Sequence, residues 1–397
     1  ICTAPGEYEG TVTVKSGGEV QLTFTVRLLV VNHALPPVSE WAFHLDLWQF
    51  PFQLSGLCAD NGQKVTPFSS EYFTLVKPFY QLLADAGQKV ITAYIKDGAF
   101  NKGQTMVKWH EAADGKWSFD YTGFDKFVAQ MMSWGIGRQI SCFSLVGWNT
   151  SIGYTDASGE ARTLKLTVGS DEYRTVWNEF LDSFERHLKT KGWFEKTVLY
   201  MDEIREDEMR QVVSFIKQHN PDWKIGLAGS AVSSDVESAF YDYSTILGYD
   251  RTSTNAVATF YTSCAQSIPN AYVSLDNNPA EMVWVAWYAK AKGLNGFLRW
   301  AYDYWTKADP QDVRDGNNTA GDFSLIYRSD NSLSSVPLSS IRLELLREGI
   351  QDYEKMRILS TNLMNPVVQK FTLTSGRFAG EIVTEAQGML KKISAEY

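Results

Sequence analysis

Residues 197–230 read TVLYMDEIREDEMRQVVSFIKQHNPDWKIGLAGS, and this stretch predicts a strand, a helix and a second strand. TVLYM is a run of apolar and β-favouring residues, and KIGLAGS at 224–230 is another. The segment between them opens with acidic residues and ends with Lys217, His219 and a proline, which suits the dipole of a helix. Because strands joined through a helix run parallel, the stretch predicts a parallel α/β architecture.

The same alternation continues along most of the chain. Apolar runs occupy residues 43–49, 89–95, 138–146, 197–203, 224–230, 243–249, 257–263 and 296–302, and helical patterns separate most of them. Eight strand-helix units over about 320 residues predict an α/β fold of the (β/α)8 TIM-like barrel type. Only DRTSTNA separates the sixth and seventh runs, which is too short for a crossover helix, so we expect an irregular barrel there.

The two ends of the chain differ from this pattern. Residues 1–35 alternate β-formers around Gly17 and Gly18, which indicates a β-hairpin. Two strands alone are marginally stable, so this segment must either pack on the main domain or be the remnant or edge of an N-terminal β-domain. We expect the barrel to span 36–360, after a boundary at Pro36 and Pro37, and a C-terminal loop and helix to pack on it at 361–397.

Composition and motifs exclude several function classes. The net charge of -9 disfavours nucleic acid or an anionic membrane as a partner, and no apolar run approaches the ~20 residues of a transmembrane helix. The four cysteines are far apart, which makes a zinc site or a disulfide framework unlikely. GxSxG, HExxH, P-loop and GxGxxG motifs do not occur in the sequence. Serine hydrolase, zincin and nucleotide-dependent functions therefore lack sequence support.

Barrel enzymes carry their active sites at the carboxyl ends of the strands. The predicted strand ends are rich in carboxylates, indoles and phenols and nearly free of histidine, a composition that suits a sugar-cleaving site. Arg299 would either pair with Asp46 or Asp97 or bind sugar hydroxyls. The catalytic candidates are Asp202 and Glu203, and the candidates for substrate binding, several of which could equally serve packing, are Trp48, Trp148, Asn149, Tyr261, Arg299, Trp300, Tyr302 and Trp305.

Asp202 and Glu203 are two like charges at the end of one predicted strand. Successive strand side chains point to opposite faces, so both can reach one pocket only where the strand ends and the backbone turns. A structural alternative makes Asp202 the cap of a helix beginning near Ile204, with Glu203 in its first turn. Side by side, the charges would also help to keep one carboxyl protonated.

Several stretches together resemble glycoside hydrolase family 123. They are APGEYEGTVTV, LDLWQ, DGKWSFDYTGFDKFV, HLKTKGWFEKTVLYMDE, FYTSC, PNAYVSLDNNPAE, GFLRWAYDYW and SSIRLELLREGIQDYEKMR. The resemblance implies a retaining, exo-acting β-N-acetylgalactosaminidase that acts on a glycan or glycoconjugate. It implies that Asp202 and Glu203 are the catalytic carboxylates, that no metal or organic cofactor takes part, and that the protein is secreted or periplasmic.

In that mechanism the 2-acetamido oxygen of the substrate replaces the protein nucleophile. Asp202 would then orient the acetamido N–H, Glu203 would protonate the leaving oxygen, and Tyr261 or Tyr302 could hydrogen-bond the acetamido carbonyl. The loops at 96–110 and 314–327 depart from the family pattern at the rim. Cleavage of another 2-acetamido sugar, such as β-N-acetylglucosamine, and a non-catalytic sugar-binding barrel therefore stay open as alternatives.

Overall fold

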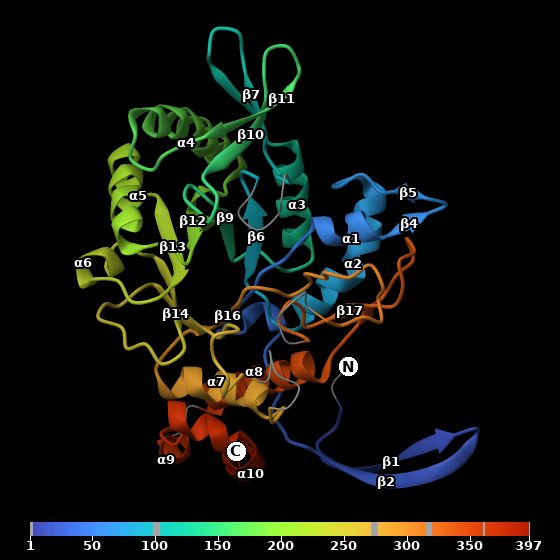
Figure 1. Ribbon diagram of the computed structural model, residues 1–397. Coiled ribbons are helices and arrows are strands. Elements are labelled where there is room, and N and C mark those ends of the chain that lie inside the picture. The colour runs from blue at the N-terminus through green and yellow to red at the C-terminus, as the bar shows by residue number, and fades with distance from the viewer. Residues whose placement is uncertain (1–2, 98–103, 271–276, 315–319, 360–361, 397) are drawn as a thin grey trace.

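The computed structural model describes residues 3–97, 104–270, 277–314, 320–359 and 362–396. Its centre is a sheet of eight parallel strands with helices between most of them, a TIM-like barrel (Figure 1). All eight predicted runs are confirmed as strands. In spatial order these are β3 (His44–Leu47), β16 (Gly296–Arg299), β15 (Val257–Tyr261), β14 (Asp242–Ile246), β13 (Lys224–Gly229), β12 (Thr197–Asp202), β9 (Gln139–Phe143) and β6 (Val90–Tyr94).

The barrel is nearly closed between β3 and β6. A single bridge joins Leu45 to Gln88, where the N–H of Lys89 donates to the Leu45 oxygen at 3.0 Å. The Gln88 side chain extends this contact, because its Oε1 accepts from the N–H of Leu47 at 2.9 Å. A buried amide side chain thus satisfies backbone groups where a regular ladder is missing.

Helices surround the barrel and meet the sequence expectations closely. Gly192, with φ +70°, forms the C-cap of the helix at residues 171–191. The helices are α1 (Phe52–Leu57), α2 (Ser70–Asp85), α3 (Thr122–Ser133), α4 (Asp171–Lys191), α5 (Glu206–His219), α6 (Ser234–Glu237), α7 (Glu281–Ala291), α8 (Ile341–Leu359), α9 (Asn365–Val368) and α10 (Ala379–Glu396). Short 3-10 turns are η1 (Val38–Glu40), η2 (Phe194–Lys196), η3 (Asn362–Met364) and η4 (Leu373–Phe378). The C-terminal α10 contacts α7 and α8 (Figure 1).

The irregularity between the sixth and seventh strands is confirmed. Residues 247–256 connect β14 to β15 without a helix. Glu237, at the end of α6, is fully buried and accepts from the N–H groups of Thr252 and Ser253 at 3.0 and 2.9 Å. Arg251 donates to the backbone oxygens of Tyr243 and Thr259. Side-chain hydrogen bonds therefore hold the connection in place of a packed helix.

Additional strands that the sequence did not predict lie at the rim. Two hairpins, β7 (Lys108–Glu111) with β8 (Trp117–Asp120) and β10 (Ser151–Thr155) with β11 (Ala161–Lys165), join in one sheet through β7 and β10. They project above the barrel (Figure 1). Shorter pairs are β4 (Ala59–Asp60) with β5 (Gln63–Lys64) and β17 (Tyr327–Arg328) with β18 (Pro337–Leu338). Residues 98–103 and 315–319, within the two divergent loops, lie outside the described ranges.

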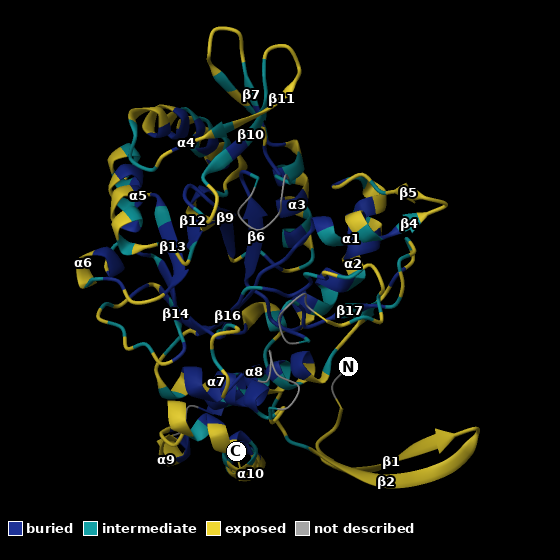
Figure 2. Cartoon of the chain, viewed as in Figure 1, coloured by how far each residue is buried: buried dark blue, intermediate teal, exposed yellow. Residues whose placement is uncertain are grey.

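The predicted N-terminal hairpin consists of β1 (Gly6–Ser16) and β2 (Glu19–Val30). It extends away from the barrel and is exposed on both faces (Figure 2). Val12 faces Phe24 and Val14 faces Leu22 across the pair, and all of these side chains are about half exposed. Of the two expectations for this segment, packing on the main domain is wrong, and its assignment to an N-terminal β-domain stays a prediction.

Candidate active site

Asp202 and Glu203 lie at the carboxyl end of β12, where the backbone turns. Asp202 is the last strand residue, and Glu203 has φ +50°, in the left-handed region that few non-glycine residues adopt. The N–H of Glu203 still donates to the Ala228 oxygen of β13 at 2.8 Å. The turn therefore cancels the strand alternation, which is the arrangement required for both carboxylates to reach one pocket.

The capping alternative for this pair is wrong. Helix α5 begins at Glu206, its N-cap residue is Arg205, and no side chain makes a cap hydrogen bond there. The acids of its first turn are Glu206, Asp207 and Glu208. Asp202 and Glu203 therefore precede the helix and do not stabilise its N-terminus as cap or first-turn residues.

The surroundings of Asp202 clearly shift the pKa of its carboxyl. Burial raises the pKa of the Asp202 carboxyl well above its ordinary value, and the negative charge of Glu203 raises it further. Glu203 is exposed at the mouth of the barrel. In the protein without substrate, the adjacent charge therefore acts on Asp202, the more buried member, and favours its protonated form.

Tyr261 ends β15 and reaches across the mouth to the pair. Its hydroxyl donates to Glu203 Oε1 at 3.0 Å, and only 6% of the residue is exposed. Burial, followed by the charge of Glu203, raises the pKa of the Tyr261 phenol. The phenol therefore stays protonated and serves as a hydrogen-bond donor at the centre of the site.

Trp148 and Asn149 lie on the loop that follows β9, at the rim. The Trp148 indole N–H donates to the backbone oxygen of Asp202 at 3.3 Å, while 74% of the residue is exposed. Asn149 is also exposed, and its Oδ1 accepts from the N–H of Ser151 at 2.9 Å. The structure thus brings Trp148, Tyr261, Asp202 and Glu203 together.

Three other aromatic candidates are buried away from the mouth. Trp48 packs edge-on against Phe143 and Tyr200 inside the barrel. The Tyr302 hydroxyl donates to the Phe79 oxygen at 2.9 Å, and the Trp305 indole donates to the Ile326 oxygen at 2.9 Å. Because Trp48 is fully buried and the polar atoms of Tyr302 and Trp305 bond to backbone oxygens, the structure does not place these side chains where a substrate would pass.

Arg299 is fully buried and forms an ion pair with Asp322, so the expected pairing with Asp46 or Asp97 is wrong. The physical reason is the strand register. Leu298 stands beside Asp46 in the ladder, and Arg299 stands beside Leu47, so Arg299 and Asp46 point to opposite faces of the sheet.

Trp300 is half-buried in a cluster of aromatic rings. Its ring centroid lies 6.0 Å from those of Phe50 and Tyr304 and 4.7 Å from that of Phe323. The expected stacking wall of Trp300, Tyr302 and Trp305 is therefore not assembled, since the Tyr302 hydroxyl and the Trp305 indole bond to backbone oxygens elsewhere. Tyr304 was visible in the same GFLRWAYDYW stretch but was not singled out.

Sequence reasoning also missed a buried carboxyl below the pair. Tyr200 precedes Asp202 by two residues, and its hydroxyl donates to Asp242 Oδ1 at 3.4 Å. Gln139 donates to Asp242 Oδ2 at 2.6 Å. Burial raises the pKa of Asp242 to about 7. Asp242 opens β14, one residue before the predicted run, so strand-end reasoning could not have found it.

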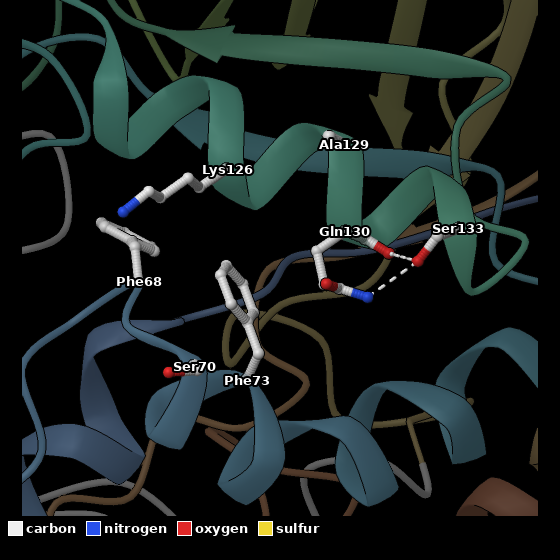
Figure 3. Close-up of a pocket in the computed structure, with 7 residues that line it drawn as sticks. All are labelled: Phe68, Ser70, Phe73, Lys126, Ala129, Gln130 and Ser133. Atoms are coloured by element: carbon white, nitrogen blue, oxygen red, sulfur yellow. Dashed lines mark hydrogen bonds between the residues drawn. The ribbon is translucent and has the colours of Figure 1, made fainter.

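Cavities away from the strand ends do not belong to this site. One of about 450 Å³ lies between α2 and α3 on the outer wall of the barrel, beside Phe68, Phe73 and Lys126 (Figure 3). Across the described ranges, no three His, Cys, Asp or Glu side chains are grouped so that they could hold a metal ion. Among the helices seen in those ranges, none has the length and apolar character needed to cross a membrane.

Comparisons with known proteins agree with this fold. The family described as glycoside hydrolase 123, catalytic domain, matches residues 54–359. A family 123 glycoside hydrolase from Clostridium perfringens, whose structure is described as giving the details of glycolipid glycan hydrolysis, is 25% identical. The match covers 98% of this chain and 76% of that chain, with a TM-score of 0.85.

Other solved structures are much less similar. The catalytic domain of GH30 xylanase C from Talaromyces cellulolyticus is 12% identical, with coverages of 79% and 76% and a TM-score of 0.40. The endo-beta1,6-glucanase BT3312 is 9% identical, with coverages of 87% and 83% and a TM-score of 0.47. The search of curated proteins found no match. Since the matched family segment spans most of the sequence, the chain belongs to glycoside hydrolase family 123 and is an enzyme that hydrolyses glycans.

Proposed function

We propose that the protein is a retaining, exo-acting β-N-acetylgalactosaminidase that uses the acetamide of its substrate as the nucleophile. The observation that supports this proposal is the turn at Glu203, directly after the end of β12, which would allow two adjacent carboxylates to face one mouth. Two neighbouring residues suit a reaction in which neither has to attack the sugar. The family membership and the glycolipid-glycan hydrolysis described for the similar enzyme support the substrate class.

In the first step, the acetamido carbonyl oxygen attacks the anomeric carbon and the glycosidic bond breaks. Glu203 donates its proton to the leaving oxygen, which carries away the bonding electron pair. Asp202 accepts a hydrogen bond from the acetamido N–H, and its ionised form stabilises the positive oxazolinium ring. Burial raises the pKa of Asp202 in the protein without substrate, whereas a hydrogen bond from the acetamido N–H favours its ionised form, so in the substrate complex the proton lies on Glu203.

In the second step, water attacks the anomeric carbon and Glu203 removes a proton from that water. The bond between the anomeric carbon and the oxazolinium oxygen breaks, which restores the acetamide. Two inversions retain the configuration. Of the two tyrosines, Tyr261 is the better candidate to donate a hydrogen bond to the acetamido carbonyl. Its hydroxyl lies at the mouth, whereas the hydroxyl of Tyr302 bonds to the backbone oxygen of Phe79. Residence outside the cytoplasm, which would expose the enzyme to such glycans, is part of the proposal.

The test is release of nitrophenol from a panel of β-glycosides by wild type, Asp202→Asn and Glu203→Gln. We expect cleavage of the N-acetylgalactosaminide alone, and a loss of at least about 100-fold in each variant because each removes a proton-transfer or charge-stabilising group. The unfolding temperature of each variant controls for misfolding. Cleavage of the N-acetylglucosaminide would change the assigned sugar. Sugar binding without any cleavage would contradict the proposal and favour a binding protein.

A further inference from the structure

Trp148 is unusual among the tryptophans of this chain. It is 74% exposed, whereas the other twelve of the thirteen are buried or half-buried. Burying apolar surface gains about 25 cal/mol per Å², so an indole left in water forgoes stabilisation that most tryptophans obtain. Its indole N–H donates to the backbone oxygen of Asp202 at 3.3 Å. The exposed ring therefore lies directly beside the catalytic pair.

The loop that carries Trp148 is fixed from below by a buried lysine. Lys96, which is 1% exposed, donates from Nζ to the oxygens of Asp97, Asn149 and Ser151 at 2.9, 2.8 and 3.0 Å. The neighbouring carboxylate of Asp97 accepts from the N–H of Gly153 at 2.8 Å. The backbone is thus held on the C-terminal side of Trp148, where the chain enters β10.

Gly153 is required for this arrangement. A Cβ at position 153 would lie 2.6 Å from Asp97 Oδ2, closer than real Cβ atoms come. A larger residue would therefore require the carboxylate of Asp97 to move from the position in which it bonds to the loop backbone. The hydrogen bonds made by Asp97 and Lys96 therefore fix the backbone of the rim loop next to the exposed indole of Trp148.

We propose that Trp148 is the stacking platform for the aglycone, the part of the glycan that leaves, and that Lys96 is the positioning residue for this platform. The inference rests on the proposed function. The sugar to be cleaved must lie over the recessed carboxyl of Asp202, so the exposed ring at the rim meets the portion of the glycan that emerges from the mouth. Indole rings stack on apolar sugar faces, and a ring already held in place loses little entropy on binding.

The experiment separates the aglycone from the cleaved sugar. For wild type and Trp148→Ala, it measures kcat/KM for an oligosaccharide ending in β-N-acetylgalactosamine and the Kd of a thiazoline mimic of the oxazolinium, which has no aglycone. We expect kcat/KM to fall about tenfold, mainly through KM, with the thiazoline Kd changed less than twofold. Phe378→Ala, which removes a ring that is 61% exposed in η4, is the matched control and should change neither value.

Two outcomes would overturn the platform. Equal losses for oligosaccharide and thiazoline would assign Trp148 to the cleaved sugar, and no loss for either would leave the ring without a role. A wild type that fails to bind the thiazoline contradicts the proposed function instead. If the wild type does not bind the thiazoline, the platform can still be tested with the oligosaccharide that lacks the terminal N-acetylgalactosamine. The Kd of this shortened oligosaccharide should rise about tenfold in Trp148→Ala.

Lys96 is tested through the same readouts with Lys96→Met. This variant should raise KM for the oligosaccharide and leave the thiazoline Kd unchanged, a split that a general loss of folding would not produce. Gly153→Ala, which displaces the Asp97 carboxylate by its Cβ, is the second variant and should act in the same direction. An unchanged KM in both folded variants would overturn the positioning role.

Discussion

Glu203 shows how one backbone conformation can define a site. Only Asn61 and Phe68 share its positive φ among the non-glycine residues in the described ranges. A residue held there costs on the order of 1 kcal/mol or more, and such strain is found where the surrounding structure imposes it. The sequence predicted the adjacent carboxylates and the need for a turn, but φ at Glu203 depends on the hydrogen bond to Ala228 in β13, which local sequence does not specify.

Asp242 gives a pH prediction at the residue scale. Burial raises its pKa in the folded protein to about 7, from an ordinary value of 3.8. Between pH 4 and pH 7 the Asp242 carboxyl holds its proton more tightly in the folded state than in the unfolded state. The stability that this protonated carboxyl contributes is therefore lost as pH rises from about 4 to about 7. The expected loss is on the order of 4 kcal/mol. Asp242→Asn removes this titration.

Urea unfolding between pH 4 and 8 checks this expectation. The free energy of unfolding of Asp242→Asn should increase relative to wild type as pH rises, because only wild type must ionise a buried carboxyl. Asp222→Asn, at an exposed position, should show no such trend. A difference between Asp242→Asn and wild type that does not vary with pH would contradict the assigned burial cost.

Strands and helices were predictable where their patterns were strong. The eight barrel strands are apolar runs, and α4 and α5 carry clear helical periodicity and end charges. The rim hairpins were not predicted because β7, β8, β10 and β11 are four or five residues long and partly polar. The two hairpins join where Thr155 pairs with His110, 45 residues away, and periodicity within a single run does not reveal such a contact.

The connection that replaces a helix between β14 and β15 gives a prediction at the element scale. Glu237→Ala would leave the partly buried N–H groups of Thr252 and Ser253 without their acceptor. We expect the free energy of unfolding in urea to fall by about 3 kcal/mol. Glu237→Gln keeps one acceptor oxygen and should lose clearly less. Equal stability of Glu237→Ala and wild type would show that this carboxylate does not hold the connection.

At the scale of the whole barrel, the sequence predicted some of the residues that lie together at the site, but not all of them. Strand ends located Asp202, Glu203, Trp148 and Tyr261 correctly as neighbours at one face of the fold. The same reasoning also selected Trp48, Tyr302 and Trp305, which are buried. The sequence shows that a residue lies near a strand end, but it does not show which other segments pack over its side chain. Lys96 was missed because its role lies in the tertiary contact between two loops.

The central claim is that the acetamide of the substrate, and no side chain of the protein, attacks the anomeric carbon. The most direct test is hydrolysis of nitrophenyl β-N-acetylgalactosaminides whose acetyl group carries none, one, two or three fluorine atoms. Fluorine withdraws electrons from the carbonyl oxygen, so kcat should fall steeply with each atom added. A kcat that stays constant across the series would contradict acetamide participation and require a nucleophile from the protein.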